Sequence, residues 1–264
     1  MTFLGYMDRL QAVLERIKRE QAVNIEKAGS LVADALSTGG IVHTFGTGHS
    51  HLIADEAFFR AGGIAAINPI LNERLIFLKG ALESSRAERE SGLALSMIER
   101  EHVSSEDVAI IISNSGRNAV PIEMALEMQA RGVKVVAITN LEQSGSSISR
   151  HSSGKKLYEI AEISIDNCVP AGDALLTLPG LASPIGPSST VAGAAIINSI
   201  IIEAVAKLLR LGEQVPVLPS ANIEGVSEET LSRILIRYKG RIRYLDMDED
   251  GTDGSALRGS EGVL

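Results

Sequence analysis

Five short apolar runs constrain the fold of this chain more than any other feature of the sequence. They are "GIVHTF" (40–45), "GIAAINP" (63–69), "DVAIIIS" (107–113), "VKVVAIT" (133–139) and "EIAEISI" (159–165). Runs of this length, rich in Val and Ile and bounded by polar or glycine residues, are typical of buried strands. Because the apolar character is continuous rather than alternating, we expect a mainly parallel sheet that is covered on both faces.

Helical patterns lie between most of these runs, at about 49–61, 86–101 and 118–131. Strands that alternate with helices predict an α/β fold. A parallel sheet of this kind binds its ligands outside the carboxyl ends of the strands. The loops that follow the first and third runs are therefore the first places to look for a site.

Segments of different character flank the predicted sheet. Residues 6–37 carry apolar residues at helical spacing and predict one helix or a broken pair of helices. After the last strand, a connection rich in Pro and Gly leads to a helix at about 191–211 that is apolar nearly all round. We divide the chain into an N-terminal helical segment, a sheet domain, a C-terminal extension and a tail expected to be disordered: 1–39, 40–212, 213–245 and 246–264.

Composition excludes several classes of protein. The formal net charge is −8, whereas proteins that bind nucleic acid through its phosphate backbone carry clustered Lys and Arg. The single cysteine, Cys168, excludes an intrachain disulfide. The N-terminus shows no signal-peptide pattern, and the most apolar segment, 191–202, is shorter than the roughly 20 residues of a membrane span. We expect a cytoplasmic protein with no nucleic-acid or membrane partner.

The loop "FGTGHS" follows the first predicted strand. Gly46 and Gly48 let the backbone approach a ligand closely, and Thr47 and Ser50 add hydroxyl groups at the start of a helix. The third glycine of a dinucleotide motif would fall at His51, and no P-loop lysine follows. A tight turn without a ligand and an unusual nucleotide site stay open as alternatives.

A second polar loop, "ISNSGRN", follows the third predicted strand and precedes a helix. Ser113, Asn114, Ser115 and the backbone at Gly116 offer donors to an anion held at the N-terminus of that helix. Two such loops in one parallel sheet are stronger evidence than either alone, because a phosphate and sugar hydroxyls can be bound between them.

Both loops, the stretch "ISNSGRNAVPIEMALEMQARGVKVVAITN" and the order of elements resemble the sugar isomerase (SIS) domain. The resemblance spans about 40–211. "GPSST" and "VPVLPSANIEG" further resemble a bacterial branch of sugar isomerase domain-containing proteins, and phosphoheptose isomerases and N-acetylmuramic acid 6-phosphate etherases are more distant relatives. The family implies a flavodoxin-like αβα sandwich, a phosphosugar ligand, and a homodimer or homotetramer that completes the site across subunits.

By this resemblance, a set of glycine, hydroxyl and amide residues would bind the phosphosugar. Ser50, Ser113, Ser115 and Asn118 would contact it, with Asn118 standing where many relatives have Thr; the amide still supplies a donor. The full set of expected substrate-binding residues is Gly46, Thr47, Gly48, Ser50, Ser113, Asn114, Ser115, Asn118 and Ser189.

Catalysis is the less determined part of the expectation. Aldose–ketose isomerisation needs a base near the C1 and C2 hydrogens, usually a carboxylate. The catalytic glutamate of the relatives would fall at Arg60, and Asn198 stands in the helix that carries their histidine. We therefore expect the catalytic groups to be Glu56, Glu88 and His49. A salt-bridged helix acid, a capping-box acid and a helix cap are the respective structural alternatives.

Two readings of the function follow. The first is a phosphosugar isomerase or a related carbon–oxygen lyase. The second, favoured by the displaced carboxylate, is a non-catalytic phosphosugar-sensing or regulatory module. His49 and His51 lie two residues apart and would face different sides of a helix, so we expect no metal site. We also expect no cofactor.

Overall fold

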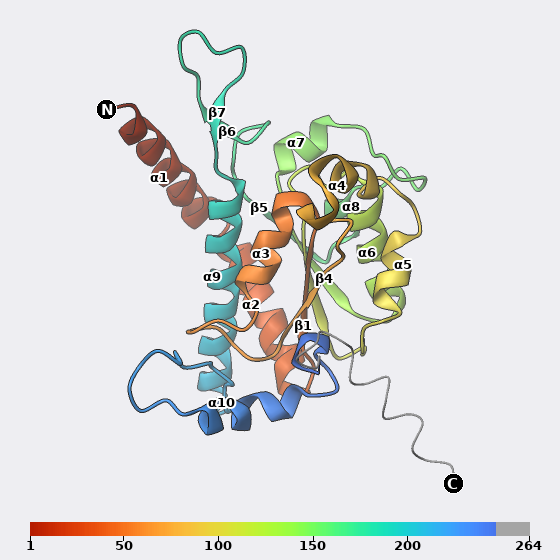
Figure 1. The fold of residues 1–264 in the computed structure, drawn as a ribbon, viewed down its shortest axis with the longest axis vertical. Coiled ribbons are helices and arrows are strands. Elements are labelled where there is room, and N and C mark those ends of the chain that lie inside the picture. Colours follow the sequence, from red (N-terminus) through yellow and green to blue (C-terminus); the bar gives the residue numbers. More distant parts are fainter. Residues whose placement is uncertain (247–264) are drawn as a thin grey trace.

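The computed structural model describes residues 1–246, and within them five strands form an all-parallel sheet in the order β2-β1-β3-β4-β5 (Figure 1). Each strand lies within one of the five apolar runs or extends it by a single residue, which confirms the expected α/β class. The strands are β1 (Val42–Gly46), β2 (Ile67–Ile70), β3 (Val108–Ile112), β4 (Lys134–Thr139) and β5 (Ile163–Asp166).

Helices cover both faces of the sheet and give three layers. One face packs against α2 (Ala22–Ser37), α3 (His51–Glu56) and α9 (Ser189–Arg210). The other face packs against α4 (Ala81–Ala87), α5 (Leu93–Ile98), α6 (Ala119–Ala130) and α8 (Leu157–Ile160). Three elements lie at the carboxyl-end side of the sheet in Figure 1: the N-terminal half of α1 (Thr2–Glu20), α7 (Leu141–Ser146) and the antiparallel hairpin of β6 (Ala174–Leu176) and β7 (Ile185–Pro187).

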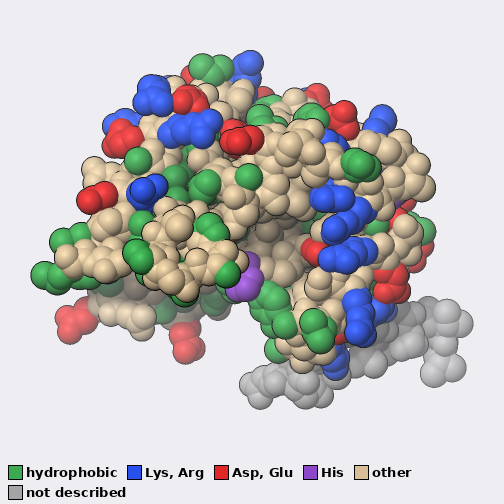
Figure 2. All heavy atoms as spheres, turned by 90° about the horizontal axis from the view of Figure 1, so that it is seen from above, with side chains coloured by type: hydrophobic (Ala, Val, Ile, Leu, Met, Phe, Trp, Pro, Cys, Tyr) green, Lys and Arg blue, Asp and Glu red, His purple; other side chains and the backbone are tan. Residues whose placement is uncertain are grey.

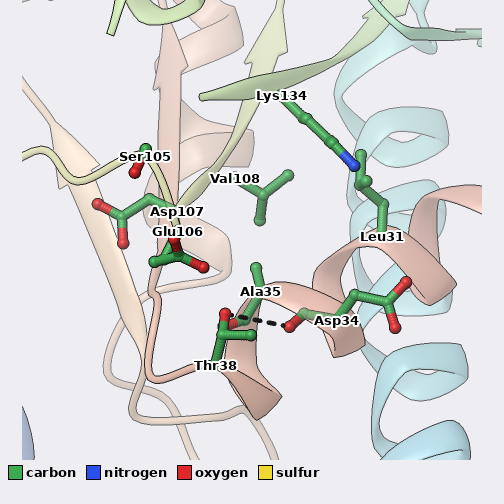
Figure 3. A pocket seen from close by; sticks show the side chains of 9 residues that line it. All are labelled: Leu31, Asp34, Ala35, Thr38, Ser105, Glu106, Asp107, Val108 and Lys134. Carbon is green, nitrogen blue, oxygen red and sulfur yellow. Dashed lines mark hydrogen bonds between the residues drawn. The ribbon is translucent and has the colours of Figure 1, made fainter. Parts of the chain in front are cut away.

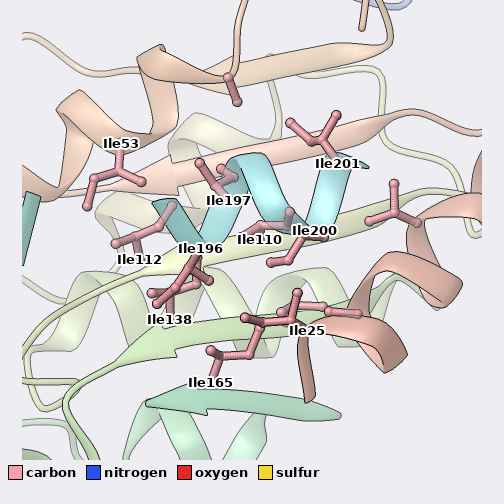
Figure 4. Packing of buried hydrophobic residues seen from close by; sticks show 14 of the residues in the cluster. Ile25, Ile53, Ile110, Ile112, Ile138, Ile165, Ile196, Ile197, Ile200 and Ile201 are labelled. Carbon is pink, nitrogen blue, oxygen red and sulfur yellow. The ribbon is translucent and has the colours of Figure 1, made fainter. Parts of the chain in front are cut away.

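The two cores follow from the alternation of side chains along each strand. Ile110 and Ile112 of β3 point to one face, where they pack among isoleucines of α9 such as Ile196 (Figure 4). Ile111, between them, points to the opposite core with Phe45. Because every residue of β3 is buried, the strand has no polar face, as the unbroken apolar run predicted.

Two predicted helices are wrong in extent. The pattern at 49–61 yields a helix that ends at Glu56, and the pattern at 86–101 yields two short helices, α4 and α5, rather than one. The two helices are separated by residues 88–92, and Gly92, whose φ of 87° is left-handed, directly precedes α5. The N-terminal segment forms the broken pair that was one of its two predicted forms, with Gln21 between α1 and α2.

The C-terminal extension returns to the amino-end side of the sheet. It contains α10 (Glu228–Leu235), and the side chain of Arg241 donates to the buried Asp107 at 2.7 Å. Apart from Asp246, the tail predicted at 246–264 lies outside the described residues. Helix α9 is long and apolar enough to cross a membrane by length and composition; here one side of it, with Ile196 and Ile200, packs into the core beside α2, while Ile202 and Leu209 are exposed.

Candidate functional site

The two polar loops lie side by side at the point where the sheet reverses its direction of growth. After β1 the chain forms β2 on one side of it, and β3 then pairs with the other side, so that Gly46 lies opposite Ile112. In an open α/β sheet this switch point is where ligands bind, next to the carboxyl ends of the strands. Figure 2 looks onto this end of the molecule and shows a recess, with a band of Lys and Arg side chains along one side.

The first loop is held in one tight conformation. A Cβ atom at Gly46 would lie 2.4 Å from the carbonyl oxygen of Ser50, so the turn requires glycine. Gly48 has a φ of 53°, and its carbonyl accepts a hydrogen bond from Nδ1 of His51. The hydroxyl of Thr47 donates to Glu88 at 3.1 Å. The Thr47 hydroxyl of this loop therefore already has a protein partner.

The second loop is held by bonds of its own. The hydroxyl of Ser113 accepts from the N–H of Gly116 at 3.2 Å, and the side-chain oxygen of Asn114 accepts from Asn167 at 2.8 Å. Gly116 has a φ of 57°, and a Cβ atom there would lie 2.8 Å from the hydroxyl of Ser144. These contacts hold the loop in place while its remaining polar groups stay available.

Three of the expected binding groups are unoccupied donors. Among residues 1–246, the hydroxyls of Ser50 and Ser115 have no hydrogen-bond partner. Asn118 accepts a bond from Arg150 through its oxygen at 2.9 Å, which leaves its NH₂ group without a partner in the same part of the chain. Both serines are half-buried, so their hydroxyls are reachable from solvent. Neutral donors in this arrangement suit an oxygen-rich ligand such as a phosphate ester.

Two charged residues contact the polar loops: Arg150 donates to Asn118 of the second loop, and Glu88 accepts from Thr47 of the first. Glu88 lies at the end of α4; its side chain accepts from Thr47, and its backbone carbonyl accepts from the N–H of Val120 at 3.2 Å. It thereby bridges the first loop and the first turn of α6. Of the predicted carboxylates, Glu88 is the one that contacts a predicted binding loop.

Glu56 lies at the end of α3 and contacts Arg60 and Asn198, the two residues that stand at the relatives' catalytic positions. Its carboxylate forms an ion pair with Arg60 and accepts from Asn198 at 3.3 Å. The neighbouring Asp55 is partly buried, which raises the pKa of its carboxyl, while the nearby His51 lowers it to a smaller degree. Ser189 also has a protein partner, because its hydroxyl and N–H both donate to Asp173, at 2.6 Å each.

The histidines of the first loop contact an aromatic ring. His49 is exposed, and its ring centroid lies 4.7 Å from that of Phe77; the ring of His51 lies 5.8 Å from the same phenylalanine. Phe77 belongs to a short helical turn, Phe77–Lys79, beside the loop. In the described part of the chain, no group of three His, Cys, Asp or Glu side chains could hold a metal ion.

A pocket lies at the opposite end of the sheet, next to the amino ends of the strands. It has a volume of about 210 Å³ at the amino ends of β3 and β4 and is shown in Figure 3. Its polar lining includes Asp34, Thr38, Glu106 and Lys134, and Asp34 is paired with Lys207 at 2.6 Å. No predicted site residue lines it. The switch point, where the loops that carry the unpaired donors follow neighbouring strands, is the better candidate site.

The sequence model of the SIS domain matches residues 5–140, which include both polar loops. The chain belongs to the SIS domain family. The expected resemblance is therefore confirmed, and the five-stranded parallel sheet is the SIS sheet. Two loop features assigned from this resemblance, at Ser50 and at Ser113–Asn118, lie within the matched range.

Close relatives extend the match to nearly the whole chain. A UPF0309 protein of Geobacillus thermodenitrificans is 44% identical over 240 residues, covering 91% of this chain and 96% of the relative. Another, from Thermoanaerobacter pseudethanolicus, is 43% identical over 246 residues, covering 92% and 99%. Among solved structures, the phosphoheptose isomerase GmhA from Neisseria gonorrhoeae aligns with a TM-score of 0.52 over 78% of this chain and 97% of that chain; at 12% identity this likeness concerns the fold.

Sequence reasoning missed Arg150 and Phe77 as neighbours of the SIS loops. Arg150 is 32 residues from Asn118 along the chain and reaches it from the segment after α7. Neither residue carries a local pattern that marks it, because only the fold brings it to the loop.

Proposed function

We propose that this SIS protein binds a phosphosugar between the loops Gly46–Ser50 and Ser113–Asn118. The supporting observation is that the loops carrying Ser50, Ser115 and Asn118, whose donors have no partner among residues 1–246, follow the neighbouring strands β1 and β3 at the switch point. The phosphate is bound by the second loop and the N-terminus of α6, and the sugar hydroxyls lie toward Ser50. The N-terminus of a 12-residue helix adds a favourable partial positive charge.

The proposed chemistry is aldose–ketose isomerisation or a related carbon–oxygen lysis. In the isomerase form, Glu88 removes the proton from C2 of the open-chain aldose while O1 is protonated, which gives an enediol; the protonated Glu88 then returns a proton to C1 as the C2 hydroxyl loses its own, so that the ketose forms without a net change in atoms. Glu88 is preferred over Glu56 because it contacts Thr47 in the first loop, whereas Glu56 is bound by Arg60 and Asn198. His49, exposed beside the loop, is proposed to assist ring opening.

A regulatory module that senses a phosphosugar is the second candidate. It is supported by the ion pair of Arg60 with Glu56, since this pair neutralises the one acid of α3 that was expected to be catalytic. Binding of the phosphosugar is common to both candidates, and turnover separates them.

Assembly and location belong to the same proposal. Phe3, Leu4 and Met7 of α1 are 59%, 47% and 54% exposed, and we propose that they are buried in a cytoplasmic homodimer or homotetramer. Light scattering at micromolar concentration tests this; a monomer would contradict it. The acidic net charge supports the absence of a nucleic-acid partner.

The function is tested in two steps. A thermal-shift panel of hexose, amino-sugar, N-acetylmuramate and heptose phosphates, with the unphosphorylated sugars, inorganic phosphate and NAD, identifies the ligand, because a ligand that binds the folded state raises its stability. The best phosphosugar is then incubated in D₂O and followed by NMR for deuterium at C2 or for product. Wild type and Glu56→Gln should exchange the proton, and Glu88→Gln should bind but not exchange it.

The outcomes separate the candidates. Exchange that is lost in Glu88→Gln supports the enzyme. Binding with no exchange in the wild type supports the sensing module. Stabilisation by NAD, with none by any phosphosugar, would refute both.

A further inference from the structure

Three arginines from three separate connecting segments lie near the first turn of α6. Arg117 belongs to the second loop, and Arg150 donates to Asn118 while its backbone N–H bonds to the carbonyl of Arg117 at 2.8 Å. Arg89 follows Glu88, whose backbone carbonyl accepts from Val120 of α6; the Arg89 guanidinium donates to Ser85 at 3.4 Å and is close enough to act on the charge of Arg150. We call Arg89, Arg117 and Arg150 the arginine cluster.

The cluster carries uncompensated positive charge. Burial lowers the pKa of Arg150, and the positive charges of Arg117 and Arg89 lower it further, while Glu88 opposes this effect. Among residues 1–246, none of the three arginines is in an ion pair within 4 Å. Two carboxylates lie nearby: Glu88, and Glu123 of α6, which accepts from the N–H of Gly92 at 2.8 Å and lies 3.6 Å from His151. The three guanidinium groups outnumber them, so the local charge stays positive. This is unusual in a chain whose formal net charge is −8.

The excess of positive charge suits a phosphate monoester, which carries about −1.5 to −2 at neutral pH. The hydroxyls of Ser50 and Ser115 and the amide of Asn118 are neutral, and such donors bind any oxyanion of the right shape. Guanidinium groups form stronger, charge-assisted bonds as the negative charge of their partner increases. The neutral donors thus supply shape, and the cluster supplies sensitivity to charge.

We propose that the arginine cluster makes the site selective for the dianionic phosphate ester, so that it discriminates against a singly charged ester of the same shape. This inference rests on the proposed phosphosugar site and adds three residues to it. The cluster distinguishes the charge of the bound ester, whereas Ser115 contributes to the affinity for either ester.

The test uses sugar 6-sulfates, which have the tetrahedral shape of 6-phosphates but one negative charge. Titration calorimetry at pH 7.5 compares the 6-phosphates and 6-sulfates of glucose, galactose and N-acetylglucosamine. The variants are Arg117→Gln/Arg150→Gln and Ser115→Ala. The charge-matched control is Arg100→Gln/Arg210→Gln, since both of these arginines are exposed and lie outside the cluster. Thermal unfolding and circular dichroism check that each variant is folded.

The wild type should bind the phosphate of at least one sugar about tenfold or more tightly than its sulfate, because charge-assisted bonds are the stronger ones. The cluster variant should lose most of this ratio and retain sulfate binding, and the control variant should keep it. Ser115→Ala should weaken both esters alike. An equal affinity for both esters in the wild type, or a ratio unchanged in the cluster variant, overturns the inference while the proposed function stands. Binding of neither ester refutes both.

Discussion

Replacing Asp107 by Asn, which exchanges one carboxylate oxygen for an NH₂ group, is expected to lower the free energy of unfolding by about 2–4 kcal/mol. The side chain of Asp107 is fully buried and accepts four hydrogen bonds. One oxygen accepts from the N–H of Ile41 at 2.9 Å and from Arg241 at 2.7 Å. The other accepts from the N–H of Ser104 at 2.7 Å and from Nε2 of His43 at 3.1 Å.

An asparagine cannot satisfy these donors in either orientation. Whichever way the amide turns, its NH₂ group meets two donors, and two buried donors lose their acceptor at about 1–3 kcal/mol each, before relaxation. His43 cannot adapt by moving its proton, because its Nδ1 faces the NH₂ group of Asn68 at 3.0 Å and that group also donates to Glu101 at 2.8 Å. The cost therefore falls on the folded state.

The effect should depend on pH. Burial raises the pKa of Asp107, but hydrogen bonds from His43 and from the N–H groups of Ser104 and Ile41 outweigh it, so the pKa lies below the ordinary 3.8. A carboxyl with a depressed folded pKa stabilises the fold above its unfolded pKa, and this stabilisation is lost as the pH falls through the folded pKa. The difference between wild type and Asp107→Asn should hence be constant near neutrality and shrink below pH 3.8.

Urea unfolding at pH 7 measures the change, with Asp34→Asn as the matched control. Asp34 pairs with Lys207 at 2.6 Å but is 64% exposed, so its loss should cost less than about 1 kcal/mol. An unchanged m-value shows that the same surface unfolds in each variant. If Asp107→Asn costs no more than Asp34→Asn, the buried network does not stabilise the fold as argued.

Three further predictions concern the loops and the core. Gly46→Ala should unfold at a lower temperature and bind no phosphosugar, because the new Cβ would overlap the backbone of Ser50. The control Gly145→Ala, whose Cβ would meet nothing within 4 Å, should leave the melting temperature unchanged. Equal melting temperatures for the two variants would contradict this. Burial raises the pKa of the Cys168 thiol to about 11, so iodoacetamide at pH 8 should alkylate it only in urea, and rapid labelling of the native protein would be the opposite result. Glu56→Gln should leave phosphosugar binding within twofold in calorimetry, since Glu56 is held by Arg60 and Asn198; a loss as large as that of Ser115→Ala would place Glu56 in the site.

The sequence predicts those features that are encoded locally. The five strands follow from unbroken apolar runs, and the polar loops follow from the Gly and Ser residues at their ends, as at Gly46 and Ser113. Helix extent was predicted less well, since a turn over residues 88–92, which ends in the left-handed Gly92, interrupts the apolar pattern.

Contacts between distant segments could not be predicted in this way. Glu88 reaches Thr47 across 41 residues, and Arg241 reaches Asp107 across 134. In both cases an ordinary surface-type residue becomes a partner only because the fold positions it. The arginine cluster belongs to the same class, as its three members come from three connecting segments.

A crystal structure of the protein with the phosphosugar that gives the largest thermal shift tests the central claim most directly. We predict density for the phosphate at the switch point, within about 3 Å of the Ser115 hydroxyl and of the Asn118 amide. Density for the ligand in the pocket at the amino ends of β3 and β4, or in the groove lined by Arg9, Arg16 and Cys168, would contradict the account.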